Sequence, residues 1–441
     1  MSTNLSQRVL GYRWVIFWMM ALAFVFVYFH RLCPAVVALD LQKDLQTTGG
    51  FMGLLASAYF YPYAIMQFPA GLLSDSLGPR KTVTFFLVFA GLGSIIFGMA
   101  TGVELAVAAR IMVGFGVSMV FIPAMKILSQ WFRIREFAFM TAILNTMGGV
   151  GALTAATPLA LMTGWLGWRV SFGIVGAGTL IIAVLVWELV RNRPQDLGWP
   201  TLAEIDHIGP GTSAAPLVIP IWEGARRVLT EKYFWPVAVW FFCLVGVFFS
   251  FGGLWAGPFL MHTYGLTRIE AGNILTMIAV GLIVGSPLIS LLSDKVFHSR
   301  KKVLMLFSAV LCVLLFILNI YPNDLSTASL YIGMLLFSIS SSAIVVIGFT
   351  TTKELFPVEI AGTSVGTVNL FPFLGGAILQ PVLGWILEAY PKASPGVYSL
   401  SGYKAILLVL LGASIVALGS TFLMKETFPE PLVTESGLEK A

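Results

Sequence analysis

The sequence predicts an all-α membrane protein with twelve transmembrane helices in two pseudo-symmetric six-helix bundles. Composition is the first observation: 58% of the 441 residues are hydrophobic and 11% are charged, whereas soluble domains carry about 25% charged residues. The second is a series of twelve apolar runs, each near the roughly 20 residues that cross a bilayer. The third is an internal repeat, because features of the first six runs return about 220 residues later.

The apolar runs define the elements in chain order. The predicted spanning helices cover residues 13–38, 51–74, 82–101, 104–130, 137–162, 168–190, 234–261, 270–293, 302–322, 327–352, 361–388 and 402–424. The longest polar stretch, residues 191–233, contains five prolines and is predicted to be a linker. We expect an N-terminal bundle at 1–190, a cytoplasmic linker at 191–233, a C-terminal bundle at 234–425 and a cytoplasmic tail at 426–441.

The basic residues predict the orientation of the helices. Of the 26 Lys and Arg residues, eighteen lie on the side of the termini. The opposite side carries Lys43, Arg169, Arg268, Lys392 and Lys404. This bias places both termini in the cytoplasm and is typical of an integral protein of the cell membrane, which we expect to be a bacterial inner membrane.

Two loops at matching positions show the repeat most clearly. The sequence GLLSD ends the second run at Asp75, and SLLSD ends the eighth at Asp294. A basic cluster follows each, beginning at Arg80 and at Arg300. Two repeats of six helices predict a substrate site between the bundles, near the middle of the membrane.

The first loop, GLLSDSLGPRK, resembles the signature loop of the major facilitator superfamily, with Gly71, Asp75, Gly78, Arg80 and Lys81 at its main positions. The stretch RIMVGFG is similar to the fourth-helix motif of that family and contains Arg110. The resemblance covers the whole chain and implies the major facilitator fold. It also implies that the loop, with its second copy at Asp294 and Arg300, latches the bundles together on the cytoplasmic side. A plain positive-inside loop is the alternative, and for Arg110 we expect a structural or gating role.

Four ionisable residues lie inside the predicted spans: His30, Arg31, Arg110 and Lys126. An ionisable group at the centre of a bilayer costs at least ~2.5 kcal/mol, and such groups usually serve function. No Asp or Glu lies in the middle of a span. A basic interior without acidic partners favours an anionic substrate, because the ligand then supplies the missing charge.

The stretch VYFHRLCP in the first helix resembles two related families, the anion:cation symporters and the organophosphate:phosphate antiporters. In these families the arginine at the position of Arg31 binds the carboxylate or phosphate of the substrate, and Tyr28 occupies the matching tyrosine position. The symporters usually carry Asp where this chain has His30. The antiporters carry a second arginine in the seventh helix, and 234–261 has none.

His30 is the predicted proton carrier, since an ordinary histidine titrates near neutral pH. A neutral histidine bonded to the backbone is the alternative. Arg31, which we place beyond the middle of the membrane, is predicted to hold the anion, although its side chain could instead extend outward to the interface. Lys126 could meet the substrate or extend to the cytoplasmic interface.

Further polar residues are predicted to line the site. Tyr59, Tyr63 and Gln67 recur every four residues and share one face of the second helix. Asn145 and Asn369 occupy matching positions in the two repeats and could face each other. Trp255 lies on a glycine-rich segment that could flex as an outer gate, and Gln380 lies on the eleventh helix.

These observations predict a secondary active transporter that moves a small organic anion, a carboxylate, by proton-coupled symport. A transporter of amino acids, small peptides or other zwitterions is the alternative, as is a multidrug or metabolite exporter. Catalytic, nucleotide-binding and metal motifs are missing from the sequence, and the three cysteines suit buried thiols. We expect no enzyme activity, cofactor, bound metal or nucleic-acid partner, and a monomer in the lipid bilayer.

Overall fold

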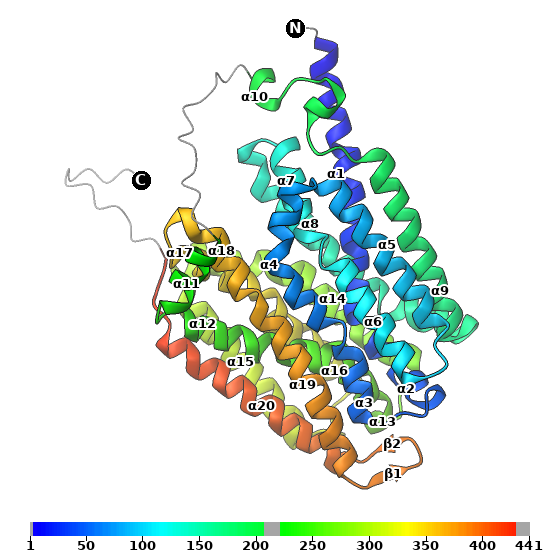
Figure 1. The fold of residues 1–441 in the computed structure, drawn as a ribbon. Helices are drawn as coiled ribbons and strands as arrows, with labels where there is room; N and C mark the ends of the chain where they lie inside the picture. The colour runs from blue at the N-terminus through cyan, green and yellow to red at the C-terminus, as the bar shows by residue number, and fades with distance from the viewer. Residues whose placement is uncertain (1–2, 207–220, 429–441) are drawn as a thin grey trace, which may run out of the picture.

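The computed structural model describes residues 3–206 and 221–428 and is built almost entirely of helices (Figure 1). The helices of the first half are α1 (Thr3–Leu32), α2 (Pro34–Asp44), α3 (Gly49–Ser57), α4 (Phe60–Ser76), α5 (Pro79–Gly98), α6 (Val103–Val117), α7 (Phe121–Trp131), α8 (Ile134–Thr154) and α9 (Thr157–Leu189). The segment that follows contains the 3₁₀ helix η1 (Pro194–Leu197), α10 (Leu202–Ile205) and α11 (Ile221–Thr230).

The second half has more interruptions than the first. Its α-helices are α12 (Phe234–Trp240), α13 (Ala256–Tyr264), α14 (Arg268–Leu291), α15 (Arg300–Ile320), α16 (Thr327–Ser338), α17 (Val345–Glu354), α18 (Val358–Val368), α19 (Leu370–Ala389) and α20 (Leu400–Leu423). Four π-helical segments join them: η2 (Phe241–Val245), η3 (Phe248–Trp255), η4 (Leu292–Phe297) and η5 (Ile339–Ala343). A hairpin of β1 (Lys392–Ser394) and β2 (Val397–Tyr398) precedes α20.

The described residues give twelve crossings, which confirms the predicted fold class. Ten helical stretches are long and apolar enough to span a membrane. One of them, Phe139–Leu189, has 51 residues and reverses direction at Gly167, whose φ is 74°. The pair α3–α4 supplies the remaining crossing. Large apolar side chains such as Ile65 and Leu423 lie exposed on the outer faces, where lipid would surround them.

Several spanning helices are broken in the turn before a proline. A proline cannot donate the hydrogen bond that would continue a helix, but it fits the first turn of the next helix, where the N–H groups have no helical partner. Each of these prolines lies in the first turn of the helix after a break: Pro34, Pro62, Pro123, Pro158 and Pro372. The chain therefore carries its breaks near the middle of the molecule.

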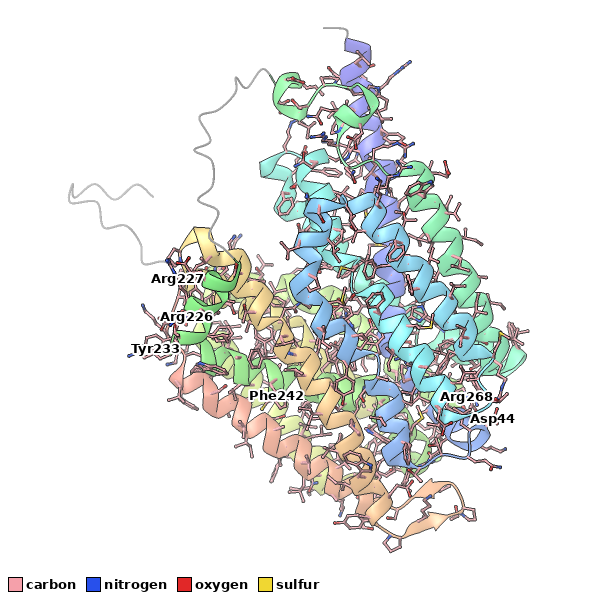
Figure 2. The ribbon with its side chains drawn as sticks, viewed as in Figure 1. Asp44, Arg226, Arg227, Tyr233, Phe242 and Arg268 are labelled. Atoms are coloured by element: carbon pink, nitrogen blue, oxygen red, sulfur yellow. The ribbon has the colours of Figure 1, made fainter. Side chains whose placement is uncertain are left out.

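The two ends of the bundle differ in what they carry (Figure 1). The first turns of α1, the end of α9 and the end of α20 lie at one end, which we call the terminal end. The β1–β2 hairpin and the loop after α2 lie at the opposite end, which we call the distal end. Figure 2 shows Asp44 and Arg268 at the distal end and Arg226 and Arg227 far from them. The domain limits remain a prediction; below, α1–α9 are the N-terminal helices and α12–α20 the C-terminal helices.

The start of the linker is attached to the N-terminal helices. Arg133 pairs with Asp206 through two hydrogen bonds of 2.6 Å, and the indole nitrogen of Trp131 donates to the carbonyl of Arg191 at 2.9 Å. Glu136 accepts hydrogen bonds from Arg13 and from the backbone N–H of Arg133. Burial raises the pKa of the Glu136 carboxyl, but the hydrogen bonds and the two guanidinium groups outweigh it and lower the pKa.

Candidate functional site

Arg31 lies in the last turn of α1, beside the break at Cys33. Its guanidinium contacts Tyr63, which lies near the middle of the α3–α4 pair. Along α1 and α2 together, which run from Thr3 to Asp44, Arg31 lies past the midpoint. Its depth in the membrane, beyond the middle toward the outside, stays a prediction. The side chain is 5% exposed and stays inside the protein.

Four aromatic rings surround the Arg31 guanidinium, and we call them the ring cage. The guanidinium carbon lies 4.6 Å from the ring centre of Tyr28 and 5.0 Å from that of Tyr63. It lies 5.5 Å from Phe249 and 5.2 Å from Phe373, both on C-terminal helices. Cations are attracted to the faces of aromatic rings at such distances. The cage therefore joins the two halves of the protein around one charge.

The rings of the cage also pack on one another. Tyr63 and Phe373 have ring centres 4.3 Å apart, and Phe249 and Phe373 stack with an angle of 14° between their planes. Phe60 packs on Phe249 at 4.9 Å. The sequence analysis missed Phe60, Phe249 and Phe373. Phe373 follows Asn369 by one helical turn, a spacing that could have indicated a shared face.

Arg31 has no acidic partner in the part of the chain that the structure describes. Its Nε atom is buried without a hydrogen bond, and the titratable groups nearby are the phenols of Tyr59, Tyr63 and Tyr28, which are uncharged at neutral pH. Burying a cation without a counter-charge is costly. The surroundings of Arg31 are therefore suited to a ligand that brings a negative charge.

His30 lies in different surroundings from Arg31. Its ring is fully buried and packs against Phe26 and Phe29, with ring centres 6.4 Å and 5.6 Å away. Neither ring nitrogen has a hydrogen-bond partner among the described residues. The structure therefore separates His30 from the ring cage. The alternative of a histidine ring bonded to the backbone gains no support either, and a role in proton transfer stays a prediction.

Arg110 forms a hydrogen bond with the backbone at the break in the first helix. Its Nη1 donates to the carbonyl of His30 at 3.0 Å and lies 3.9 Å from the Cys33 sulfur. In an unbroken helix that carbonyl would accept from residue 34, but Pro34 has no N–H. Arg110 thus replaces the missing donor, and its guanidinium also lies 5.2 Å from the ring centre of Tyr59.

Gln67 and Asn369 connect the two halves beside the cage. The Asn369 amide donates to Oε1 of Gln67 at 3.1 Å, and Gln67 also donates to the carbonyl of Tyr63 at 3.2 Å. Tyr59, Tyr63 and Gln67 therefore point from the second helix toward the same region: Tyr59 and Tyr63 approach Arg31, and Gln67 approaches Asn369. Asn145 is exposed on α8, and the structure pairs Asn369 with Gln67 in its place.

Gln380 and Trp255 hold the C-terminal wall of the cage. The Gln380 amide donates to the carbonyl of Phe249 at 2.9 Å, which fixes the backbone from which that ring extends. The Trp255 indole donates to the carbonyl of Gln380 at 3.1 Å. Both residues are buried, so they act here as supports of Phe249. A gating role for Trp255 stays a prediction.

Lys126 lies toward the terminal end on α7. Its ammonium donates to the carbonyl of Ser74 at the end of α4, at 3.0 Å. A cation at the C-terminal end of a helix is favourable, because the last carbonyl groups have no helical partner. This places Lys126 in contact with the predicted loop motif, and contact with a substrate stays a prediction.

The residues of the first loop motif, at the terminal end, form their hydrogen bonds with the N-terminal helices and the start of the linker. Gly78 has a φ of 83°, a conformation that favours glycine, and it precedes α5. The Arg80 Nε donates to the carbonyl of Trp187 at 2.8 Å, and the backbone N–H of Arg80 donates to Asn192. Gly71 and Lys81 lie at the same end. The Asp75 side chain lies outside the described residues.

The second copy of the motif forms its ion pairs with residues of the C-terminal helices. Arg300 pairs with Asp294 and, at 3.3 Å, with Glu354. The contacts of Arg80 and Arg300 thus each stay within their own half. A latch between the halves at this end stays a prediction.

The hydrogen bonds between the halves concentrate at the distal end. Asp40 on α2 pairs with Arg268 at the start of α14. Gln42 bonds the hydroxyl of Tyr398, and the first N–H of α3, at Gly49, donates to Glu388 at 2.7 Å. The backbone of α3 also packs directly on α19, because a Cβ added to Gly53 would lie 2.4 Å from the carbonyl oxygen of Gln380. The sequence analysis missed these contacts.

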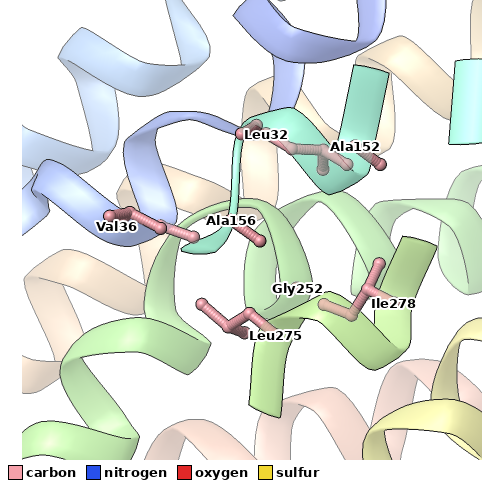
Figure 3. A pocket seen from close by; sticks show the side chains of 9 residues that line it. Leu32, Val36, Ala152, Ala156, Gly252, Leu275 and Ile278 are labelled. Atoms are coloured by element: carbon pink, nitrogen blue, oxygen red, sulfur yellow. The ribbon is translucent and has the colours of Figure 1, made fainter. Parts of the chain in front are cut away.

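Other parts of the seam combine hydrogen bonds, such as that of Tyr61 to the Ala377 carbonyl and that of Thr157 to Asn273, with apolar contacts. A cavity of about 10 Å³ lies between α2, the α8–α9 turn, η3 and α14. Figure 3 shows the small and branched side chains that line it, such as Ala152 and Val36. It is too apolar to hold an ordered water. No group of three or more metal-binding side chains occurs among the described residues. The site therefore offers one buried guanidinium, aromatic rings and a few amides.

Comparisons with known proteins agree with this architecture. The model of the Major Facilitator Superfamily matches residues 16–379 and 253–439. The D-galactonate transporter of Escherichia coli O6:H1 is 27% identical over 86% of this chain and 90% of its own length. The probable sulfoacetate transporter SauU of Cupriavidus necator is 24% identical over 87% and 89%. A bacterial homologue of the human lysosomal transporter Spinster, solved in an inward-facing and unoccupied conformation, shares the fold with a TM-score of 0.73 and 19% identity over 93% and 96% of the chains.

Proposed function

This chain belongs to the Major Facilitator Superfamily, and we propose that it carries a small organic anion, a carboxylate, across the membrane by alternating access. The observation that carries the proposal is Arg31, a buried guanidinium at the junction of the two halves with no acidic partner among the residues that the structure describes. A guanidinium can hold a carboxylate through two parallel hydrogen bonds. The anion would supply the charge that the protein interior lacks.

The relatives support the choice of an anion. Galactonate and sulfoacetate, which name two of the related transporters, are both organic anions. Among the described residues, the two other cations inside the predicted spans, Arg110 and Lys126, already donate to backbone carbonyls, so they are less available than Arg31 for the second charge of a phosphate ester. We therefore favour a carboxylate over a phosphate ester.

Alternating access is supported by where the halves meet. The ion pair of Asp40 with Arg268 and the bond of Gly49 to Glu388 both lie on the distal side of the cage. We propose that these contacts close the distal end and that they separate when the site opens there. The excess of basic residues at the terminal end supports a cytoplasmic location for that end. We propose in addition that the protein works as a monomer in a bacterial inner membrane.

We propose further that transport is coupled to protons through His30. His30 is the titratable group that lies beside Arg31 in the sequence, and its ring is fully buried with no hydrogen-bond partner in the described part of the chain. A bound anion would favour protonation of a nearby imidazole. Substrate and proton would then strengthen the binding of each other.

A ligand screen on the purified full-length protein tests the binding step. Carboxylates, phosphate esters, amino acids and dipeptides are compared by thermal shift on the wild type, on Arg31→Gln and on the control Arg169→Gln. Arg169 is 41% exposed and pairs with Asp44 at the distal end. We expect a carboxylate to stabilise the wild type and the control, and to bind Arg31→Gln about 100-fold more weakly, because two charge-assisted hydrogen bonds are lost. A cationic or zwitterionic hit that Arg31→Gln retains would contradict the proposal.

A further inference from the structure

The wall around Arg31 is aromatic to an extent that the transport of an anion does not require. Four rings face the guanidinium, and Phe60 extends the stack behind them. We infer that this site selects a monoanion with an aromatic body, an arylcarboxylate of the benzoate or phenylacetate type, over a polyhydroxylated acid. The inference rests on the proposed function and names the class of anion.

The charge of the site limits the charge of the ligand. Of the cations in the described spanning helices, Arg110 donates to the His30 carbonyl and Lys126 to the Ser74 carbonyl. Both are held by the backbone, which leaves the guanidinium of Arg31 as the group that faces the junction of the halves. One guanidinium balances one carboxylate. A second negative charge on the ligand would remain buried without a counter-charge.

The amides beside the cage are already bonded within the protein. Asn369 donates to Gln67, Gln67 donates to the Tyr63 carbonyl, and the Gln380 amide donates to the Phe249 carbonyl. A sugar acid brings several hydroxyl groups. The Gln380 Oε1 has no partner among the described residues and could accept from one of them, but the others would have to break one of these bonds or remain unpaired against a ring. Buried polar groups without partners weaken binding strongly. The amides therefore disfavour a polyhydroxylated body.

The rings of the cage favour a ligand with an aromatic body. Phe249 and Phe373 come from C-terminal helices and cover Arg31, so an entering carboxylate has to displace them from the guanidinium. An aliphatic or hydroxylated body would leave these rings without a flat partner. An aromatic body would pack against them at the spacing that Phe249 and Phe373 already keep, 5.8 Å between centres.

Direct binding of three probes tests the inference. Phenylacetate, cyclohexylacetate and gluconate are titrated into the purified full-length protein by calorimetry. All three carry one carboxylate, and they differ in having a flat apolar, a puckered apolar or a hydroxylated body. We expect phenylacetate to bind about tenfold or more tightly than gluconate, with cyclohexylacetate between them. Phe373→Leu should reduce the preference for phenylacetate over cyclohexylacetate.

A matched variant controls for general effects of losing a phenylalanine. Phe316 lies on the outer face of α15 and is 54% exposed, so Phe316→Leu should keep the wild-type order of affinities. Gluconate binding as tightly as phenylacetate, with both lost in Arg31→Gln, overturns the aromatic selection and leaves the proposed function standing. Binding of all three that survives Arg31→Gln overturns both. A preference for phenylacetate that Phe373→Leu and Phe249→Leu both leave intact also overturns the inference.

Discussion

Arg31 and His30 are neighbours in the chain, but their side chains lie in different parts of the protein. Successive residues of a helix point about 100° apart, so one can face the partner half while the other faces its own bundle. Arg31 contacts Phe249 and Phe373 of the C-terminal helices, whereas His30 contacts Phe26 and Phe29 of its own helix. The anion site and the predicted proton site therefore lie on different faces of α1, at neighbouring positions.

Replacing His30 tests whether it carries a proton. His30→Gln removes the titratable ring, so proton-driven uptake into proteoliposomes should lose its dependence on external pH between about 5.5 and 7.5, the range in which histidine titrates. His262→Gln is the control, because this histidine bonds Tyr403 within the C-terminal helices. A His30→Gln protein with the wild-type pH profile would rule out this role.

At the scale of the elements, the breaks in the helices shape the site. Pro34 interrupts the first spanning helix between α1 and α2. The carbonyl of His30, which Pro34 cannot bond, accepts a hydrogen bond from Arg110. The break at Asn369, in the turn before Pro372, places the amide that bonds Gln67. A straight helix at either position would bond its own backbone and leave these polar side chains without their present partners.

A double-mutant cycle tests the role of Arg110. Arg110→Met leaves the buried His30 carbonyl with the weak thiol donor of Cys33 alone and should lower the free energy of unfolding by about 1–3 kcal/mol. In a Pro34→Ala background, residue 34 regains an N–H that can bond the same carbonyl. The cost of Arg110→Met should then fall by about 1 kcal/mol. Denaturation of the four proteins in detergent measures this, and equal costs in the two backgrounds would show that Arg110 acts elsewhere.

The helices were largely predictable from sequence, and their contacts were not. Apolar runs and short polar loops indicated each crossing, because a bilayer requires about 20 apolar residues in a row. The side chains that meet across the halves depend on how two bundles pack, and no local pattern encodes that packing. Phe249 and Phe373 are two of 34 phenylalanines in the chain, so their presence in the cage became visible only in the structure.

The candidate site was predicted only in part, because local patterns indicate its polar residues and do not indicate which residues pack against them. Arg31, Tyr28 and Tyr63 stood out because charged and polar residues are rare in spanning helices, and the structure brings them together. Asp40 and Arg268 did not stand out, because both lie in polar segments at the ends of spans, where charges are common. Their pairing depends on the approach of α2 to α14.

At the scale of the whole molecule, the charged contacts between the halves lie at the distal end, and the contacts of the repeated loops stay within each half. Asp40 with Arg268 and Glu388 with Gly49 hold the distal side together, while Arg80 and Arg300 each bind their own bundle. Such an arrangement suits a state in which the distal end is closed. A transporter of this kind needs a second state in which those contacts are broken.

The most direct test of the anion site is exchange transport by the purified protein in liposomes. Vesicles loaded with unlabelled phenylacetate receive labelled phenylacetate outside, with gluconate in a parallel series and protein-free vesicles to subtract passive leak. We predict that the wild type and Arg169→Gln exchange at least one of these acids, and that Arg31→Gln exchanges neither faster than protein-free vesicles. Exchange by Arg31→Gln at the wild-type rate would contradict the assignment of Arg31 as the anion-binding residue.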